Sequence, residues 1–316
     1  MAHALIQVLQ AQHPQAHLAI LAPKSTLPIT ELMPEIQERF LLEDGHKEFN
    51  FKRRWRLARQ IRRQHFDVAY ILPNTLKSAV IPFLAGIPKR IGWKGESRYV
   101  LLNDLRKNVE ALPLMVGRYV ALAYPDGAFK AGDAFPYPKL TIPGHSHKNG
   151  HPDAGRSSAG KKLVISPSAA YGPAKRWPSE YFAAVAKAKL DEGWKVQMIG
   201  APSDQEVAEA ILTVEPRIES FVGKTSLVEM ATLIAQSDQM LTNDSGPMHI
   251  GAAFEIPLVA IFGSSSPGFT PPLGEKVCVI EKNDLPCKPC FQRTCPFGHY
   301  NCLREITPQH VLKALA

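Results

Sequence analysis

Apolar segments of helical spacing alternate with short apolar runs from the first residues of the chain. Apolar side chains recur at helical spacing from Ala2 to Gln12, and Pro14 follows as a stop signal. The short run Leu18–Ala22 predicts a buried strand. A basic helical segment at residues 51–66 then leads into a second apolar strand at residues 67–73. The pattern therefore predicts an α/β architecture for the first half of the chain.

The alternation continues up to a segment of different composition. A helix is expected at residues 76–86, interrupted or ended near Pro82, and another at residues 113–124. The segment Pro136–Lys162 is dense in proline, glycine, serine and histidine, which is typical of a linker. A domain boundary is therefore expected within it.

The second half alternates more regularly, with four apolar strands and four amphipathic helices, which is the pattern of a parallel, doubly wound sheet. The strands are expected at residues 163–168, 194–201, 239–244 and 257–263, and the helices at 179–193, 204–214, 226–238 and 247–256, with a last helix at Pro308–Leu315. A chain of 316 residues is long for a single core. We therefore expect two α/β domains, residues 1–150 and 151–316, with a cleft between them.

The first domain begins in an unusual way. Doubly wound domains normally start with a strand whose carboxyl end carries the first binding loop, whereas this chain starts on the helix that would follow that strand. A strand is therefore expected upstream of Met1. The alternative is a domain that truly begins with a helix.

Composition restricts the partners and the compartment. The sequence is 45% hydrophobic and 21% charged, and no apolar run approaches the ~20 residues of a membrane-spanning helix. Its start does not resemble a signal peptide, and its five cysteines are crowded between Cys278 and Cys302, which favours a reducing cytoplasm. The net charge of +8 favours an anionic partner, but no nucleic-acid-binding motif accompanies it, so nucleic acid is not expected as a partner.

The most informative motif lies where the predicted strand 239–244 passes into the next helix. Asp244, Ser245 and Gly246 occupy the turn, and His249 lies in the first helical turn. Unpaired backbone N–H groups and the positive end of a helix attract phosphate, and a histidine there can donate a further hydrogen bond. The turn is therefore a candidate anion site. The alternative is that Asp244 or Ser245 only caps the helix and His249 packs on it.

Two further loops follow strands of the same predicted sheet. Ser168, Gly172 and Lys175 come after the first strand of the second domain, and Asp204 and Glu206 come after the next. Because ligands bind beyond the carboxyl ends of such strands, the lysine loop and the anion-binding turn could converge on one diphosphate. Asp204 or Glu206 could hydrogen-bond a ribose diol, and capping of the helix by Asp204 is an equal alternative.

Several long segments resemble, in the same order, glycosyltransferase family 9, the ADP-heptose–lipopolysaccharide heptosyltransferases. They are residues 71–106, Tyr171–Pro178, 242–253 and 261–273, within a resemblance that covers nearly the whole chain. It implies a GT-B fold of two Rossmann-like domains, the second binding ADP-heptose and the first receiving a lipid-linked phosphorylated saccharide. It also implies a cytoplasmic enzyme, peripheral to the inner membrane, that needs no cofactor. It would transfer heptose with inversion to heptosylated Kdo–lipid A. Another ADP-sugar transferase of the family and an inactive ADP-binding protein are the alternatives.

The resemblance also implies roles for single residues. The donor-binding set is expected to be Ser168, Lys175, Asp204, Glu206, Asp244, Ser245, Gly246 and His249. Lys175, Asp244 and His249 are its expected catalytic members, since a lysine and a helix dipole stabilise charge on a leaving phosphate. The general base of the family is an aspartate in a loop that would precede Met1, so this chain is expected to be poorly active.

Basic residues of the first domain are candidates for holding the acceptor's phosphates and carboxylates, with a solvated basic face as the alternative. The expected acceptor-binding residues are Lys77, Arg90, Lys94 and Arg98, and Lys89 and Arg106 lie among them. A separate basic run could rest on anionic lipid. It comprises Lys52, Arg53, Arg54, Arg56, Arg59, Arg62 and Arg63.

Four cysteines near the carboxyl end form a further cluster. Cys287 and Cys290 are spaced as a CxxC pair, and Cys295 and Cys302 follow at irregular intervals. This spacing could hold zinc or form a regulatory disulfide. Four reduced thiols without a metal are the simpler alternative, and no metal is expected to be required.

Overall fold

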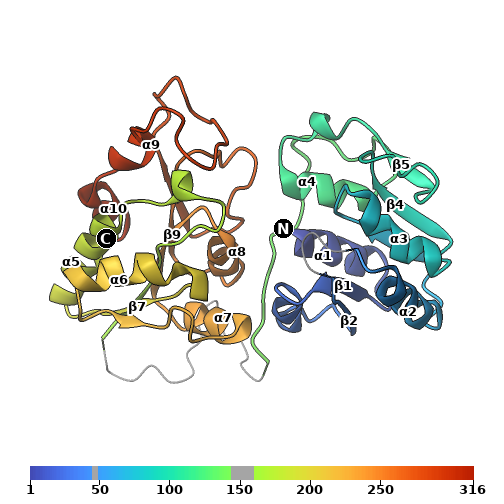
Figure 1. The fold of residues 1–316 in the computed structure, drawn as a ribbon, viewed down its shortest axis with the longest axis horizontal. Helices are drawn as coiled ribbons and strands as arrows, with labels where there is room; N and C mark the ends of the chain where they lie inside the picture. Colours follow the sequence, from blue (N-terminus) through green and yellow to red (C-terminus); the bar gives the residue numbers. More distant parts are fainter. Residues whose placement is uncertain (45–48, 144–159) are drawn as a thin grey trace. The chain divides into compact units, whose positions relative to one another are not determined.

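The computed structural model describes residues 1–44, 49–143 and 160–316, which form two compact units (Figure 1). The amino-terminal unit consists of Met1–Thr30 and Glu35–Pro136, and the carboxyl-terminal unit of Glu31–Pro34 and Tyr137–Ala316. The main division therefore falls at the start of the predicted linker. The expected boundary between residues 150 and 151 lies outside the described residues.

One sheet of six parallel strands forms the centre of the carboxyl-terminal unit, in the order β11-β10-β9-β6-β7-β8. The strands are β6 (Lys162–Ser166), β7 (Lys195–Met198), β8 (Glu219–Ser220), β9 (Gln239–Asn243), β10 (Leu258–Phe262) and β11 (Val277–Glu281). The chain lays β7 and β8 on one side of β6 and then returns to lay β9, β10 and β11 on its other side. The direction of winding thus reverses between β6 and β9, where open α/β sheets bind their ligands.

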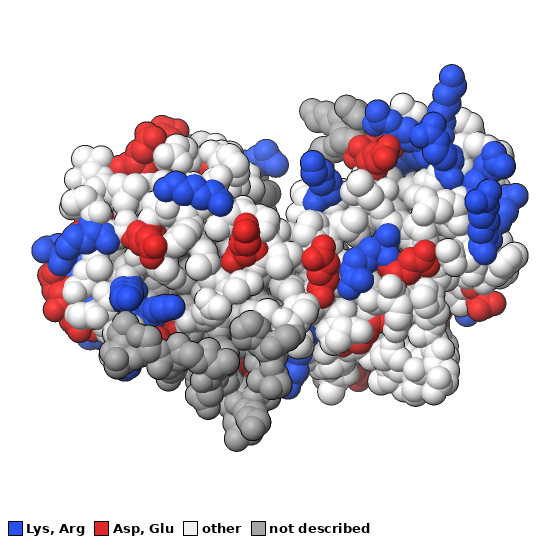
Figure 2. Space-filling view, turned by 90° about the horizontal axis from the view of Figure 1, so that it is seen from below, with Lys and Arg blue, Asp and Glu red and all other residues white. Residues whose placement is uncertain are grey.

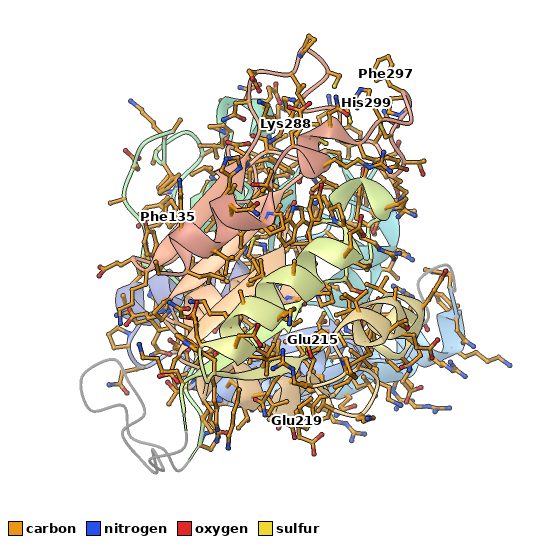
Figure 3. The ribbon with its side chains drawn as sticks, turned by 90° about the vertical axis from the view of Figure 1, so that its left-hand side faces the viewer. Phe135, Glu215, Glu219, Lys288, Phe297 and His299 are labelled. Atoms are coloured by element: carbon orange, nitrogen blue, oxygen red, sulfur yellow. The ribbon has the colours of Figure 1, made fainter. Side chains whose placement is uncertain are left out.

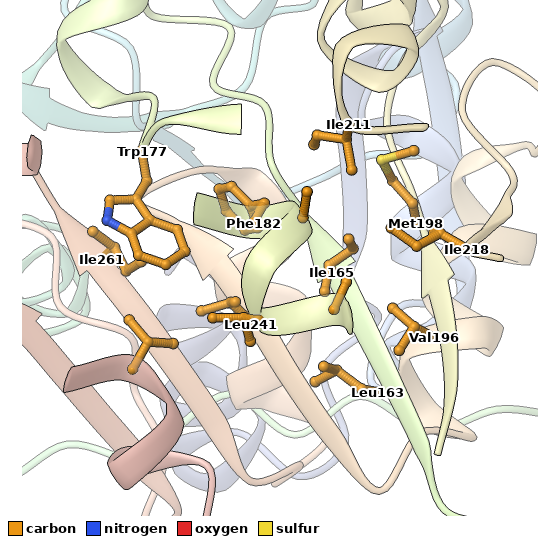
Figure 4. Close-up of a cluster of buried hydrophobic side chains, with 14 of the residues drawn as sticks. Leu163, Ile165, Trp177, Phe182, Val196, Met198, Ile211, Ile218, Leu241 and Ile261 are labelled. Carbon is orange, nitrogen blue, oxygen red and sulfur yellow. The ribbon is translucent and has the colours of Figure 1, made fainter. Parts of the chain in front are cut away.

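Helices pack on this sheet around an apolar core, which Figure 4 shows in part. The helices are α5 (Ser179–Asp191), α6 (Gln205–Val214), α7 (Leu227–Ala235), α8 (Gly246–Ala253), α9 (Asn301–Arg304) and α10 (Pro308–Ala314). Leu163 and Ile165 of β6, Met198 of β7 and Phe182 of α5 are fully buried in this core. Strands buried on both faces read as continuous apolar runs, which explains why the sequence located β6 and β10.

The amino-terminal unit carries its strands in two separate parallel sheets, β1-β2 and β3-β4-β5. The strands are β1 (Ala19–Pro23), β2 (Glu38–Leu42), β3 (Val68–Ile71), β4 (Lys89–Trp93) and β5 (Asp104–Arg106), and the helices are α1 (Ala2–Gln12), α2 (Phe51–Arg62), α3 (Leu76–Leu84) and α4 (Met115–Val120). Helix α3 continues through Pro82, where an interruption was one expectation, and ends two residues later at Leu84. Gly86, at φ +74°, follows in the left-handed conformation that commonly ends helices.

Both amino-terminal sheets contribute to one apolar cluster between α2 and α3. Ala58 and Ile61 of α2 and Ile81 of α3 are among its buried members, while Leu21 of β1 and Ala69 of β3 pack against it. The two sheets therefore share a core although β1 and β3 are not hydrogen-bonded to each other. The longest described helix, α5, has 13 residues, and none among the described residues is long and apolar enough to cross a bilayer.

Candidate active site

The loops that follow β6 and β9 meet at the point where the winding of the carboxyl-terminal sheet reverses. Ser166 of β6 lies opposite Thr242 of β9, so the residues that leave these two strands are neighbours. The end of β10 lies next to the end of β9, with Ile261 opposite Asn243. Three strand ends thus meet at one edge of the sheet, and two of them carry the motifs singled out from the sequence.

Lys175 and Asp244 form an ion pair at this edge. Lys175 ends a short 3-10 turn, Pro173–Lys175, and its Nζ lies 2.5 Å from Oδ2 of Asp244. The hydroxyl of Ser265, beyond β10, donates to the same carboxylate oxygen at 2.5 Å. The Asp244 side chain is 5% exposed and the Lys175 side chain 15%, so the carboxylate is buried and the ammonium group is closer to the surface. Sequence reasoning missed Ser265, whose only local signal is its place in a serine triplet after a strand.

Asn243, which sequence reasoning also missed, fixes the lysine turn to the sheet. Its Nδ2 donates to the carbonyl of Pro167 at 2.6 Å, and its Oδ1 accepts the backbone N–H of Trp177 at 3.1 Å. The Trp177 indole N–H donates to the carbonyl of Ile306 at 2.8 Å. Because Asn243 and Trp177 are both almost fully buried, Lys175 stands on a rigid support.

Helix α8 begins at Gly246, and Ser245, the residue after Asp244, is its N-cap. A methyl group added at Gly246 would meet no atom within 4 Å, so space is open beside the amino end of this helix. His249 is partly buried in the first turn, and burial lowers its pKa to about 4, with a smaller lowering by the charge of Lys175 and an opposing effect of Asp244. The imidazole is therefore neutral at neutral pH and can offer one N–H to an anion.

Ser168 lies in the loop after β6, and its side chain is buried. Its Oγ has no hydrogen-bond partner among the described residues, although the residue is only 6% exposed. Leaving a buried hydroxyl without a partner typically costs about 1 to 3 kcal/mol, so such an atom at a strand end indicates a position where a ligand can complete the pairing.

The loop after β7 carries Asp204, which was expected to contact a ribose. Asp204 is 9% exposed, and its Oδ2 accepts the backbone N–H of Ala201 at 2.8 Å. The carboxylate therefore stabilises its own turn, which was the structural alternative, and Oδ1 contacts only Ser203, at 3.5 Å. Glu206 lies exposed in the first turn of α6.

The four expected acceptor residues differ strongly in exposure. Arg98 is 1% exposed, and its guanidinium donates to the carbonyls of Pro73 and Trp93 at 2.5 Å. This burial favours a structural role for Arg98 and opposes direct contact with a ligand. Arg90 is half-buried and donates to two backbone carbonyls, Lys77 is half-buried in α3, and Lys94 is exposed. Direct contact with an acceptor stays a prediction for this set.

The basic run also divides by exposure. Arg54 is buried, with its Nε 2.6 Å from Oδ2 of Asp44, so it cannot contact lipid as expected. Arg62 donates to the carbonyl of Leu84 at 2.6 Å. Six members are exposed: Lys52, Arg53, Arg56, Arg59, Arg62 and Arg63.

The four clustered cysteines line one small cavity of about 20 Å³ together with His299. All of them carry free thiols. Within the described parts of the chain, no three cysteine, histidine or acidic side chains are arranged to hold a metal ion.

Comparison with known proteins places this chain in a family. The model of glycosyltransferase family 9 (heptosyltransferase) matches residues 54–301. Lipopolysaccharide heptosyltransferase 2 of Escherichia coli (strain K12) is 39% identical, over 100% of this chain and 93% of the relative. Lipooligosaccharide heptosyltransferase 2 of Haemophilus influenzae is 38% identical, over 100% and 94%. The solved structure of E. coli ADP-heptose lps heptosyltransferase II matches with a TM-score of 0.85 at 38% identity, over 99% of this chain and 92% of that chain.

The doubly wound sheet, the residues gathered at its switch point and the structural match define the chain as a glycosyltransferase of the GT-B class. The chain belongs to glycosyltransferase family 9, the heptosyltransferases. The family and the fold class expected from the sequence are therefore confirmed.

Proposed function

We propose that this glycosyltransferase moves heptose from ADP-heptose, with inversion, to the heptosylated Kdo–lipid A inner core of lipopolysaccharide. The relatives named lipopolysaccharide and lipooligosaccharide heptosyltransferase 2 support this substrate class, since they align with the whole chain. The observation that carries the proposal is the Lys175–Asp244 pair at the sheet's switch point, beside the open amino end of α8.

The donor diphosphate would bind between the lysine turn and α8. Lys175 supplies a cation, the first turn of α8 supplies backbone N–H groups, and neutral His249 and Ser168 supply further donors. Asp244, held by Ser265, would accept a hydroxyl of the heptose once Lys175 turns toward phosphate. Asp204 offers Oδ1 to the ribose while Oδ2 keeps its turn.

Catalysis would consist mainly of stabilising the departing ADP. In a displacement with inversion, negative charge grows on the β-phosphate as the sugar bond breaks. Fixed donors aimed at that charge typically contribute 10² to 10³ each, and Lys175 with the α8 dipole provides them without a metal. Lys94 and Lys77, with Arg90, would meet the acceptor's phosphates and carboxylates.

Contact with an anionic membrane would bring the enzyme to its lipid-linked acceptor. Three large aromatic side chains stand out on and beside α2: Phe49 is 53% exposed, Phe51 55% and Trp55 44%. Figure 2 shows lysine and arginine side chains gathered over the right-hand part of the view, which is the amino-terminal unit. Exposed basic residues add about 1 kcal/mol each near an anionic surface, and aromatic rings partition into its interface.

Nucleotide binding and transfer test the central claim. In calorimetry the reduced protein should bind ADP with one-to-one stoichiometry and UDP more weakly, and ADP-heptose should label heptosylated Kdo–lipid A in its presence. Absence of ADP binding would sink the proposal. Binding without transfer would identify an inactive ADP-binding protein, and transfer only to a different acceptor would identify another ADP-sugar transferase of the family.

Vesicle binding tests the membrane contact separately. Sedimentation with phosphatidylglycerol vesicles should exceed that with phosphatidylcholine vesicles, and replacing Phe51 and Trp55 by serine should weaken it. Val214→Ser is the control, because Val214 is 58% exposed in the other unit. Equal sedimentation of all three proteins would contradict the assignment.

A further inference from the structure

The loop between β11 and α9, residues 282–300, packs against the turn that carries Lys175. The carbonyl of Arg293 accepts the N–H of Ala174 at 3.0 Å, and the N–H of Phe291 donates to the carbonyl of Ser264, beyond β10, at 2.8 Å. The N–H of Ser264 in turn donates to the carbonyl of Ala174 at 3.0 Å. Backbone hydrogen bonds therefore join the loop, the lysine turn and the end of β10. Figure 3 labels three residues of this loop at one end of the carboxyl-terminal unit: Lys288, Phe297 and His299.

The close approach of this loop to the lysine turn depends on Gly172. Its backbone lies at φ +150°, a conformation that residues with a side chain rarely adopt. A methyl group added there would lie 2.5 Å from the carbonyl oxygen of Arg293 and 3.2 Å from its Cβ. Glycine thus lets the backbone of Arg293 reach the residues that precede Lys175.

The ring of Tyr171 contacts two cationic side chains. The Nζ of Lys175 lies 5.0 Å from the centre of this ring, and the Cζ of Arg293 lies 5.3 Å from it. The Tyr171 hydroxyl donates to the carbonyl of Phe291 on the same loop. Because an aromatic ring attracts a cation within about 6 Å of its centre, Tyr171 holds both cations beside the candidate diphosphate site.

Acidic side chains do not balance these two cations. Lys175 pairs with Asp244, and the same carboxylate is also bonded by Ser265. Arg293 is exposed, and no acidic side chain within residues 1–44, 49–143 and 160–316 forms an ion pair with it. Two neighbouring cations that share one carboxylate repel each other, and a bound anion offsets that repulsion. The excess of positive charge therefore favours an anionic ligand beside Lys175.

We propose that Arg293 is a second cationic contact for the diphosphate of the donor, and that the ring of Tyr171 holds it in place. A guanidinium group can donate two parallel hydrogen bonds to phosphate oxygens, which an ammonium group cannot do. Arg293 thus adds a two-pronged contact from the loop to the point charge of Lys175. Arg293 touches the ligand, and Tyr171 acts through it as a positioning residue. The identity of the ligand rests on the proposed function, whereas the anion contact does not.

Calorimetric titration with ADP, and competition against ADP by adenosine, test the contact in the full chain. Arg293→Ala should lower the affinity for ADP about tenfold, because charge-assisted hydrogen bonds to phosphate are lost, and should leave the affinity for adenosine unchanged. The variant keeps the backbone carbonyl that accepts the Ala174 N–H, so the lysine turn should stay in place.

Arg304→Ala is the matched control for this variant. Arg304 is an exposed arginine of α9 whose guanidinium lies 6.0 Å from the centre of the Tyr300 ring. Its removal should change neither affinity. Equal ADP affinities of Arg293→Ala and Arg304→Ala would overturn the proposal, and so would a loss that adenosine shares with ADP.

Further variants separate the charge, the planar donor group and the ring. Arg293→Lys keeps the charge alone, so its ADP affinity should lie between those of the wild type and Arg293→Ala. Tyr171→Phe keeps the ring and should bind ADP nearly as the wild type does. Tyr171→Leu should bind ADP several-fold more weakly and adenosine equally well. Equal ADP affinities of the two Tyr171 variants would remove the ring from its positioning role.

Inorganic pyrophosphate separates this inference from the proposed function. If the wild type does not bind ADP, the proposed function fails, and pyrophosphate then decides whether the anion contact exists. Pyrophosphate should bind the wild type more tightly than Arg293→Ala, by a factor similar to that expected for ADP. Equal pyrophosphate binding by these two proteins would overturn the contact as well.

Discussion

The strands of the two units differ in how completely their residues are buried. In the carboxyl-terminal sheet, every residue of β10 and four of the five residues of β6 and of β9 are buried. In the amino-terminal unit, β1 and β3 each have a single buried residue, Ala22 and Ile71. The first set belongs to one continuous sheet with neighbours on both sides, whereas β1 and β3 each have one hydrogen-bonded neighbour among the described strands. Strands β6, β9 and β10 are thus more completely buried than β1 and β3.

The two units also fill their interiors differently. The carboxyl-terminal core is a large apolar cluster around Trp177 and Phe182. The amino-terminal unit has several smaller clusters and buries the arginines Arg54, Arg98 and Arg106 between them. A buried guanidinium stabilises only while its partners remain, so the amino-terminal unit depends on a few polar links. The unit with the large apolar core carries the candidate donor site.

Arg54→Ala should have the largest effect, and it should fall on the amino-terminal unit alone. The substitution leaves buried Asp44 without its partner and removes the bond from Arg54 to the Lys77 carbonyl at 2.5 Å. Breaking a buried pair in this way typically costs about 3 to 5 kcal/mol. Urea unfolding followed by hydrogen exchange should show early opening of α2 and unchanged ADP affinity. Arg53→Ala is the control: its pair with Glu43, at 3.8 Å, is exposed, so a loss below about 1 kcal/mol is expected. Similar losses for both variants would mean that the buried pair is not special.

Lys175→Ala should have the next largest effect, on rate and not on stability. Removing a donor aimed at the leaving phosphate typically lowers turnover by about 10² to 10³. The lysine is 15% exposed and leaves Asp244 still bonded to Ser265, so the unfolding midpoint should shift little. Lys187→Ala in α5, with a 61% exposed side chain, provides the matched control. Steady-state transfer rates decide the matter, and a variant as fast as the control would remove Lys175 from the mechanism.

The sequence predicted the parts of the fold that are locally encoded. Strands β6 and β10 were recognised because burial on both faces goes with apolar runs. Strands β7 and β9 carry fewer apolar residues, and their alternation with helices located them. Strands β2, β5, β8 and β11 were missed, since they are short or mix exposed and partly buried positions. Such strands are defined by the neighbour they pair with, which no local pattern specifies.

The residues of the candidate site also divide into those that a local sequence pattern indicates and those that it does not. Lys175, Asp244 and His249 could be singled out as candidates because they stand at strand ends and helix starts, which sequence spacing shows. Asn243 and Ser265 were missed because their partners are distant in sequence: Asn243 bonds Pro167, and Ser265 bonds Asp244. The burial that makes Arg98 a structural residue was invisible for the same reason.

Asn243→Ala should have an intermediate effect within the carboxyl-terminal unit. The change leaves the Trp177 N–H and the Pro167 carbonyl without a partner in a dry environment, at a cost of about 1 to 3 kcal/mol. Because both groups hold the lysine turn, ADP affinity should fall along with stability. Asn283→Ala is the control, since that exposed amide bonds only Glu281. Loss of stability with unchanged ADP affinity would show that Asn243 supports the core and not the site.

His249→Gln should produce the smallest effect, which should depend on pH. Burial holds the pKa of folded His249 at about 4, below the value of about 6.5 in an unfolded chain. Between these values the unfolded chain takes up a proton that the native protein does not, so His249 costs stability as the pH falls through this window. Above pH 7 this cost vanishes. When the pH is lowered from 7.5 to 5, the free energy of unfolding of the wild type should therefore fall by up to about 2 kcal/mol more than that of His249→Gln.

The control for this pH effect is His13→Gln, whose exposed ring should give no such difference. Calorimetric or urea unfolding at the two pH values measures it. If native His249 instead protonates near neutral pH, the free energies of unfolding of the wild type and of His249→Gln should change with pH in parallel. The imidazole would then meet phosphate as a cation, and the amino end of α8 would no longer be a site built from neutral donors around one lysine.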